Sequence, residues 1–152
     1  MPGLTNKYVE DLGKLICGDN FLGVFSSDIQ PQFQKKNCKF SIIFNKDKHN
    51  QPGSHFVAIY SNRSKLFYFD SFGKKCENKL IKKFIKKNLN GRKYIFNKTC
   101  IQNNQSLFCG LFCLEFIKSQ NKKIPFEKFI NGFSNNLKRN DSIVTKMITQ
   151  DI

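Results

Sequence analysis

The spacing of apolar positions predicts three well-marked helices. Over residues 5–17, 77–90 and 109–119, apolar side chains recur every three or four positions, which is the period of one helix face. The third segment is apolar almost throughout, so we expect it to be central and buried. A shorter helix is expected after Pro125, and the polar tail from Lys138 is expected to pack loosely. The face of the first helix expected to be buried comprises Tyr8, Val9, Leu12, Leu15 and Ile16.

Runs rich in β-branched and aromatic residues predict strands over residues 38–44, 55–61 and 66–72. Short polar loops join these runs, which is typical of an antiparallel meander. Weaker strand signals lie at 21–25 and 92–102. The predicted fold class is therefore α+β, with a mixed or antiparallel central sheet flanked by helices.

The chain has 152 residues, and neither a repeat nor a linker interrupts it, so we expect a single domain over 1–152. No stretch approaches the roughly 18 apolar residues of a membrane span, and the charged start is unlike a secretory signal. We therefore expect a soluble, intracellular protein that is not secreted. The net charge of +15 favours a polyanionic partner such as nucleic acid, although a basic, solvated surface is an equally simple interpretation.

Six cysteines in such a chain are expected to be reduced thiols. Cys109 and Cys113 are four positions apart, and no second close pair of Cys or His follows, so no metal site is predicted. Cys109 falls where a polar loop meets the buried helix, where the positive end of the helix dipole favours a thiolate. Gly110 lets a ligand approach the backbone. Cys113 lies one turn deeper, where an inert core thiol is expected.

A nucleophilic thiol requires a base, and the chain has two histidines. His49 lies in a Lys- and Asn-rich loop, where solvation is expected. His55 opens a strand, and Asp70 ends the next one. A hairpin would place position 55 across from about position 71, so the His55 and Asp70 side chains would meet.

A side-chain amide before the helix could complete an oxyanion hole with the Cys109 backbone N–H. Gln102 stands seven residues before Cys109, and Gln105 is its rival at four. Each of these residues alone is more often structural: a His at a strand end is usually a satisfied core group, and an Asp before Ser-Phe-Gly is usually a turn cap. Together, in the order His, Asp, Gln and Cys, they are typical of a thiol protease whose order is permuted relative to papain.

Four segments of the chain resemble the adenovirus proteinase (adenain) family, which includes proteases of adenovirus-like, virophage and Polinton-type elements. The segments are LICGDNFLGVF, GSHFVAIY, FYFDSFG and QNNQSLFCGLFC, and a fainter match follows in IPFEKFINGFSNNL. The similarity covers roughly residues 6–140. The most specific part is Cys-Gly-Leu-Phe-Cys with Gln at the matching distance.

The resemblance implies a permuted papain-like fold in which Cys109 is the nucleophile, His55 the general base and Asp70 its orienting acid. Gln102 and the Cys109 backbone would form the oxyanion hole. The chemistry would need no cofactor, although several family members are activated by a viral peptide and by DNA. The expected substrates are capsid and other virion precursor proteins, cut at Gly-containing sites during virion maturation. The expected enzyme is a monomer without a membrane partner, acting inside the virion and at the assembly site in the host cytoplasm or nucleus.

The chain departs from the family at two positions. Phe56 stands where the family usually has Trp after the catalytic His, and Gly91 stands where adenoviruses have the cysteine that bonds the activating peptide. Residues 74–98 contain ten Lys and Arg residues and a single acid, Glu77. This basic stripe is predicted to hold viral DNA through phosphate contacts. The proposed DNA-binding residues are Lys82, Lys83, Lys86, Lys87, Arg92 and Lys93.

Two alternatives remain at this point. A ubiquitin-like-modifier protease shares the His, Asp, Gln, Cys order, but usually has Asp before the nucleophile and a shorter Gln spacing; here Phe108 precedes Cys109. A non-catalytic basic module that coats DNA would explain the charge, but not the four spaced polar residues.

Overall fold

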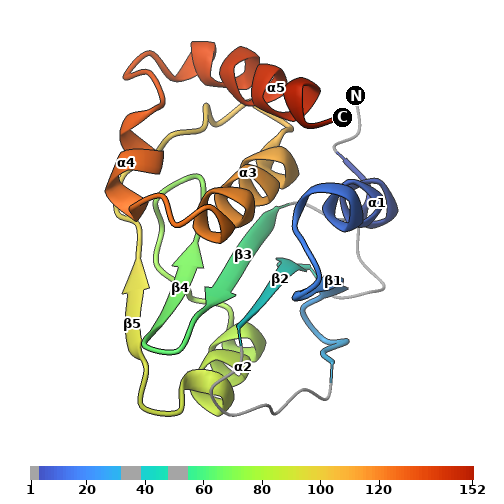
Figure 1. The fold of residues 1–152 in the computed structure, drawn as a ribbon, viewed down its shortest axis with the longest axis vertical. Helices are drawn as coiled ribbons and strands as arrows, with labels where there is room; N and C mark the ends of the chain where they lie inside the picture. The colour runs from blue at the N-terminus through green and yellow to red at the C-terminus, as the bar shows by residue number, and fades with distance from the viewer. Residues whose placement is uncertain (1–3, 32–38, 48–54) are drawn as a thin grey trace.

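The computed structural model describes residues 4–31, 39–47 and 55–152, which form a five-stranded sheet covered by helices on both faces (Figure 1). The central three strands are antiparallel, as the meander predicted, while each outer strand runs parallel to its neighbour. The sheet is therefore mixed, and its strands are adjacent in chain order. They are β1 (Phe21–Ser26), β2 (Phe40–Asn45), β3 (Phe56–Ser61), β4 (Lys65–Phe69) and β5 (Lys93–Phe96).

The β3–β4 hairpin sets the register on which the predicted site depends. Its turn is closed by the Asn62 side chain, whose Oδ1 accepts hydrogen bonds from the backbone N–H groups of Ser64 and Lys65 at 2.9 and 2.8 Å. Ser61 pairs with Leu66, and Ala58 pairs with Phe69. Continued beyond β3, this register brings position 55 opposite position 72, one residue from the expected position. The start of β3 and the residues that follow β4 therefore lie at the same edge of the sheet.

Helices α1, α3, α4 and α5 pack on one face of the sheet, and α2 packs on the other. α3 lies beside β3, between α1 and α4, and α5 lies above it in Figure 1. The helices are α1 (Asn6–Ile16), α2 (Lys79–Leu89), α3 (Cys109–Asn121), α4 (Phe126–Asn131), a 3-10 turn η1 (Leu137–Arg139) and α5 (Asn140–Asp151). The α+β class with a mixed sheet flanked by helices is thus confirmed, and α3 is central and buried as predicted.

Phenylalanine rings fill the core between α3 and the sheet. Phe116 of α3 stacks on Phe69 of β4 with ring centroids 4.8 Å apart, and Phe126 and Phe129 meet Phe116 edge-on. This aromatic packing fixes α3 against β3 and β4. The first residue of α3 is therefore held at a defined place above the sheet edge.

The buried face of α1 differs from the predicted one. Tyr8 is 50% exposed and Leu15 is 74% exposed, whereas Val9, Leu12 and Gly13 face the core. Gly13 is buried because the Phe21 ring occupies the space that a larger side chain would take. Apolar spacing alone gave the period of this helix but not its rotation about its axis.

The tail from Lys138 does not pack loosely, and that prediction is wrong. α5 packs along α3, where Val144 and Ile148 are buried in the main core. Asn140 at its start is also fully buried, and its side-chain amide donates to the Ile101 carbonyl at 2.8 Å. The strand expected over 92–102 is likewise shorter, because β5 ends at Phe96 and the chain continues as a loop toward α3.

Candidate active site

His55 and Asp70 form a buried hydrogen-bonded pair at the edge of the sheet. His55 directly precedes β3, and Asp70 directly follows β4, so the hairpin brings them together. The distance between His55 Nε2 and Asp70 Oδ1 is 2.8 Å. The Phe72 ring stacks on the imidazole with centroids 4.7 Å apart. The imidazole is thus held in its plane by a carboxylate at one end and a ring on one side.

Asp70 is itself fixed by its surroundings. Its Oδ1 also accepts the Phe72 backbone N–H at 2.8 Å. The Asn97 side chain makes two hydrogen bonds to the Asp70 backbone. It accepts from the Asp70 N–H at 3.0 Å and donates to the Asp70 carbonyl at 2.6 Å. Asn97 is a residue that the sequence analysis missed. No spacing signal links it to Asp70, because it lies in the loop after β5.

Cys109 begins α3 and adjoins the same imidazole. The Phe56 backbone N–H donates to Cys109 Sγ at 3.4 Å. Burial alone would lower the pKa of His55, but the hydrogen bonds of the imidazole to Asp70 and to Cys109 outweigh it and raise the pKa from 6.5 to about 9. Because Nε2 faces the carboxylate, Nδ1 is the ring nitrogen left for the thiol. The structure therefore brings His55, Asp70 and Cys109 together.

The other buried thiols have a different environment. Cys113 is fully buried one turn further along α3, and burial raises its pKa well above the ordinary value. Burial, together with the Glu115 and Asp151 carboxylates, raises the pKa of Cys17 to about 12. The expectation that Cys113 is a core residue is confirmed. Cys38 and His49 lie outside the described residues.

Gln102 lies completely buried in the loop that leads to α3. Its side-chain oxygen accepts from the Ser71 hydroxyl, and its Nε2 donates to the carbonyl and the hydroxyl oxygens of Ser106, each at 3.1 Å. The Ser106 hydroxyl in turn accepts the Phe108 backbone N–H at 3.2 Å. Gln105, the rival amide, is exposed in the intervening turn. Of the two candidate amides, Gln102 is therefore the one that is buried and hydrogen-bonded in the segment before α3.

The predicted basic stripe is only partly exposed. Its lysines are exposed, but Arg92 is 5% exposed and donates to the backbone carbonyls of Asn62 and Asn88 at 2.7 and 2.9 Å. Arg92 ties the end of α2 to the β3–β4 turn and is buried, so it differs from the exposed lysines with which it was grouped. Of the proposed DNA-binding residues, Lys93 of β5 is exposed, and so are four on α2, called the α2 lysines below: Lys82, Lys83, Lys86 and Lys87.

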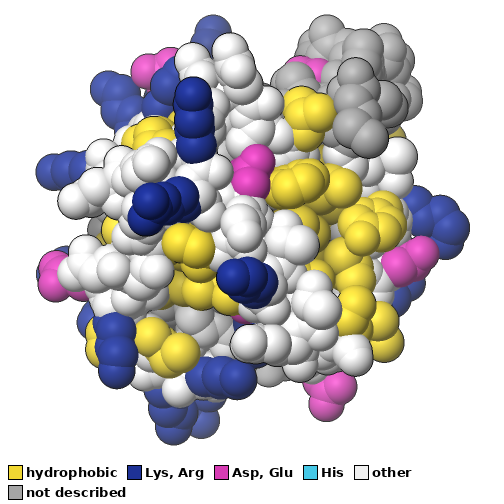
Figure 2. Space-filling model, turned by 90° about the horizontal axis from the view of Figure 1, so that it is seen from above, with side chains coloured by type: hydrophobic (Ala, Val, Ile, Leu, Met, Phe, Trp, Pro, Cys, Tyr) yellow, Lys and Arg dark blue, Asp and Glu magenta, His cyan; other side chains and the backbone are white. Residues whose placement is uncertain are grey.

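The α2 lysines lie on the opposite side of the sheet from Cys109, because α2 and α3 cover opposite faces. Basic side chains are also present elsewhere on the surface. Figure 2, which views the molecule from the α5 side, shows Lys and Arg scattered over that face and not gathered into one patch. On that face, the positive charge is distributed.

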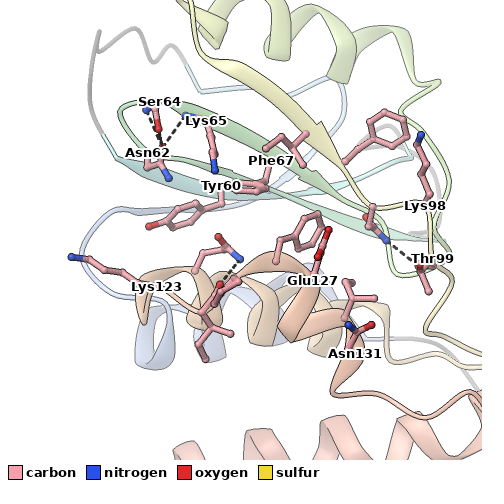
Figure 3. Close-up of a pocket in the computed structure, with 18 of the residues that line it drawn as sticks. Tyr60, Asn62, Ser64, Lys65, Phe67, Lys98, Thr99, Lys123, Glu127 and Asn131 are labelled. Carbon is pink, nitrogen blue, oxygen red and sulfur yellow. Dashed lines mark hydrogen bonds between the residues drawn. The ribbon is translucent and has the colours of Figure 1, made fainter.

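A cavity of about 990 Å³ lies apart from these residues, between the β3–β4 turn, β5 and α4 (Figure 3). Tyr60, Phe67 and Phe126 contribute apolar surface to it, and exposed lysines surround it. None of the four predicted catalytic residues lines this cavity. Asn97 lines the cavity and also holds the Asp70 backbone.

No metal-binding cluster is present in the described part of the chain, where His, Cys, Asp and Glu nowhere gather in groups of three or more with suitable geometry. Among the same residues, every helix is too short or too polar to cross a bilayer. The groups that lie near one another at the edge of the sheet are a thiol, an imidazole, a carboxylate and a buried amide.

The fold is that of known cysteine proteases. A crystal structure of the African swine fever virus (ASFV) pS273R protease matches with a TM-score of 0.61 at 17% identity, over 91% of this chain and 66% of that one. A selenomethionine form of that protease matches over 67% of this chain and 42% of that one, with a TM-score of 0.54 and 19% identity. The central domain of Lpg1148 from Legionella pneumophila also matches, with a TM-score of 0.54 and 16% identity over 99% of this chain and 96% of that one.

In sequence, the chain is similar to a protein of Acanthamoeba polyphaga mimivirus that carries the provisional name thiol protease R355. The two are 37% identical over a stretch that covers 59% of this chain. The chain spans about a third of that protein's length, because the match covers 32% of it. No family model matches the chain. The similarity is thus to viral thiol proteases in general, and it does not single out the adenovirus proteinase.

Proposed function

We propose that the protein is a viral cysteine endopeptidase in which Cys109 is the nucleophile, His55 the general base and Asp70 the residue that orients it. The observation that carries this proposal is the buried His55–Asp70 contact at 2.8 Å, with Cys109 Sγ held at 3.4 Å by the backbone N–H of Phe56, the residue next to His55. This contact occurs in a fold shared with the pS273R protease. A helix N-terminus, an imidazole and a carboxylate arranged in this way are the parts that thiol acyl transfer requires.

In the proposed reaction, the protonated His55 stabilises the Cys109 thiolate, which attacks the carbonyl carbon of the scissile peptide bond. The resulting oxyanion is held by the Cys109 backbone N–H and the Gln102 amide. His55 donates its proton to the leaving amine as the C–N bond breaks, which leaves a thioester. Neutral His55 then takes a proton from water, whose oxygen attacks the thioester, and collapse of the second tetrahedral intermediate regenerates the thiolate. Every step uses protein groups and water, so no cofactor enters the chemistry.

The proposed substrates are capsid and virion precursor proteins of the same virus, cleaved at Gly-containing sites during maturation. Support for this finer proposal comes from the resemblance of the Gln and Cys segment to the adenovirus proteinase family and from the viral origin of the mimivirus relative. We further propose that the enzyme acts as a monomer inside virions and at the assembly site. The exposed α2 lysines would hold it on packaged DNA.

The test is co-expression of the protein with the major capsid and minor virion proteins of its virus, followed by intact-mass measurement with and without DNA. We expect the wild type to trim a precursor at a Gly-containing site and Cys109→Ala to leave it intact. Cys100→Ser is the matched control, because Cys100 is an exposed thiol and serine keeps a donor for the Gln102 carbonyl, which the thiol contacts at 3.2 Å. Precursors that stay intact with the wild type, with and without DNA, would refute the capsid proposal.

The alternative of a ubiquitin-like-modifier protease uses the same residues on a different substrate. It can be separated by a modifier fused through its C-terminal Gly-Gly to a reporter. Release of the reporter by the wild type but not by Cys109→Ala, with capsid proteins untouched, would favour this alternative. A non-catalytic DNA-coating module would cleave neither substrate, and its Cys109 would label no faster than Cys100.

A further inference from the structure

The Ser106 hydroxyl is the centre of a hydrogen-bond network outside the three residues that perform the proposed chemistry. It donates to Asp141 Oδ1 at 2.6 Å and accepts from Gln102 Nε2 at 3.1 Å. It also accepts the backbone N–H of Phe108, the residue before Cys109. Asp141 belongs to the first turn of α5, so this network connects α5 to the loop that precedes α3.

The direction of each hydrogen bond follows from the groups involved. A carboxylate only accepts, so the Ser106 O–H must donate to Asp141, and its oxygen is then left to accept from Gln102. The Ser106 carbonyl also accepts from Gln102 Nε2, which requires the NH2 end of the amide to face Ser106. The amide oxygen therefore faces Ser71, whose hydroxyl must donate to it. Only one of the two amide orientations satisfies all four residues.

We infer that Ser106 and Asp141 are positioning residues for the oxyanion hole, an inference that rests on the proposed protease function. One hydroxyl holds both of the proposed oxyanion donors, the Gln102 amide directly and the Cys109 backbone through Phe108. The two Ser106 oxygens can share one amide N–H, which leaves the second for the oxyanion. A hydroxyl that donates to a carboxylate is a stronger acceptor, so Asp141 strengthens the hydrogen bond from Gln102 Nε2 to the Ser106 hydroxyl.

The arrangement also explains why α5 is attached at its first turn. Gln102 is fully buried, so water cannot replace Ser106 as the partner of its amide without a rearrangement. Asn140, the neighbour of Asp141, donates to the Ile101 carbonyl at 2.8 Å, next to Gln102 in the chain. The start of α5 therefore holds both the backbone and the side chain of this segment.

The test compares Ser106→Ala and Asp141→Asn with wild type, using a cleavable peptide and, separately, alkylation of Cys109 by iodoacetamide. Alkylation needs the thiolate but no oxyanion hole. We expect Ser106→Ala to lower kcat about 10- to 100-fold, below the roughly 100- to 1,000-fold cost of removing an oxyanion donor, with KM nearly unchanged. Asp141→Asn should lower kcat by a smaller factor, and Ser106→Thr should restore most of the activity. The Cys109 alkylation rate should stay within about twofold of wild type in each variant.

Two surface controls and a double variant complete the design. Thr149→Ala removes an exposed hydroxyl of α5, and Asp11→Asn removes an exposed carboxylate of α1; both should leave kcat unchanged. In a Gln102→Ala background, Ser106→Ala should lower kcat much less than it does in wild type.

The outcomes separate this inference from the function on which it rests. If wild type cleaves no substrate, the protease proposal fails. If wild type is active and Cys109→Ala is not, the positioning role is overturned by unchanged kcat in Ser106→Ala. An equal loss of alkylation and cleavage, or full additivity with Gln102→Ala, would also overturn it, since either result indicates a general structural role.

Discussion

Replacing Asp70 by Asn tests the central pair most directly. The substitution preserves shape and removes the charge that faces His55 Nε2 at 2.8 Å. The rise of the His55 pKa from 6.5 to about 9 corresponds to about 3 kcal/mol in favour of the imidazolium. Asp70 and Cys109 raise the His55 pKa against the opposing effect of burial, so removing the Asp70 charge should lower that pKa and reduce the imidazolium fraction near pH 7.

We expect kcat/KM at pH 7 to fall by roughly 100-fold. The net preference of about 3 kcal/mol for the imidazolium corresponds to a factor of about 150 in its population. The assay is the pH profile of peptide cleavage, which needs the His55 proton for the leaving amine. In the wild type, the reactive thiolate–imidazolium pair should be lost as pH rises through about 9, because His55 then deprotonates. In Asp70→Asn this alkaline limb should move to lower pH. A variant with full activity and an unmoved alkaline limb would refute the reasoning.

Four further outcomes follow from the same geometry. The free energy of unfolding should contain a His55 contribution that is complete below pH 6.5 and lost as pH rises through about 9, since the folded pKa is the higher one; urea titrations across this range measure it. Arg92→Gln should destabilise by about 1–3 kcal/mol in urea unfolding because a buried and a part-buried carbonyl lose their donor, whereas Lys93→Gln should change stability by less than about 0.5 kcal/mol. Gly110→Ala should lower stability by about 1–3 kcal/mol in the same assay, because its Cβ would lie 2.7 Å from Val9 Cγ2; an unchanged midpoint would contradict this packing. Changing the α2 lysines to glutamine should weaken DNA binding and reduce the slope of log K against log salt by up to about 3.6, measured by fluorescence anisotropy; an unchanged slope would exclude them as phosphate contacts.

The proximity of His55, Asp70 and the start of α3 could be predicted from sequence because it depends on short-range rules. A hairpin with a four-residue turn brings the residue before one strand close to the residues after the next, which placed His55 near Asp70. A polar loop that meets an apolar run predicts a helix start, which placed Cys109 at the first residue of α3. Both inferences need only local periodicity and turn length.

The errors arose where three-dimensional context decides. The rotation of α1 depends on how Phe21 fills the space over Gly13, which no periodicity contains. Arg92 was counted with the exposed cations because a charge is usually solvated. Instead, the Arg92 guanidinium donates hydrogen bonds to two backbone carbonyls, one at the end of α2 and one in the β3–β4 turn. A long cationic side chain can therefore be structural where a turn and a helix end converge.

The segment that forms α5 carried a signal that could have been recognised. Ile143, Val144, Met147 and Ile148 recur at helical spacing, and all four pack against the main core. The contact between Ser106 and Asp141 had no such signal. The two residues are 35 positions apart, and neither belongs to a repeating pattern. Periodicity records which face of an element is buried, but a hydroxyl and a carboxylate in a non-repeating loop and helix start are brought together only by the packing of α5 on α3. For that reason, residues that hold a catalytic group in place are harder to predict than the group itself. The contact of α5 with the segment before α3 can be seen only in the folded structure.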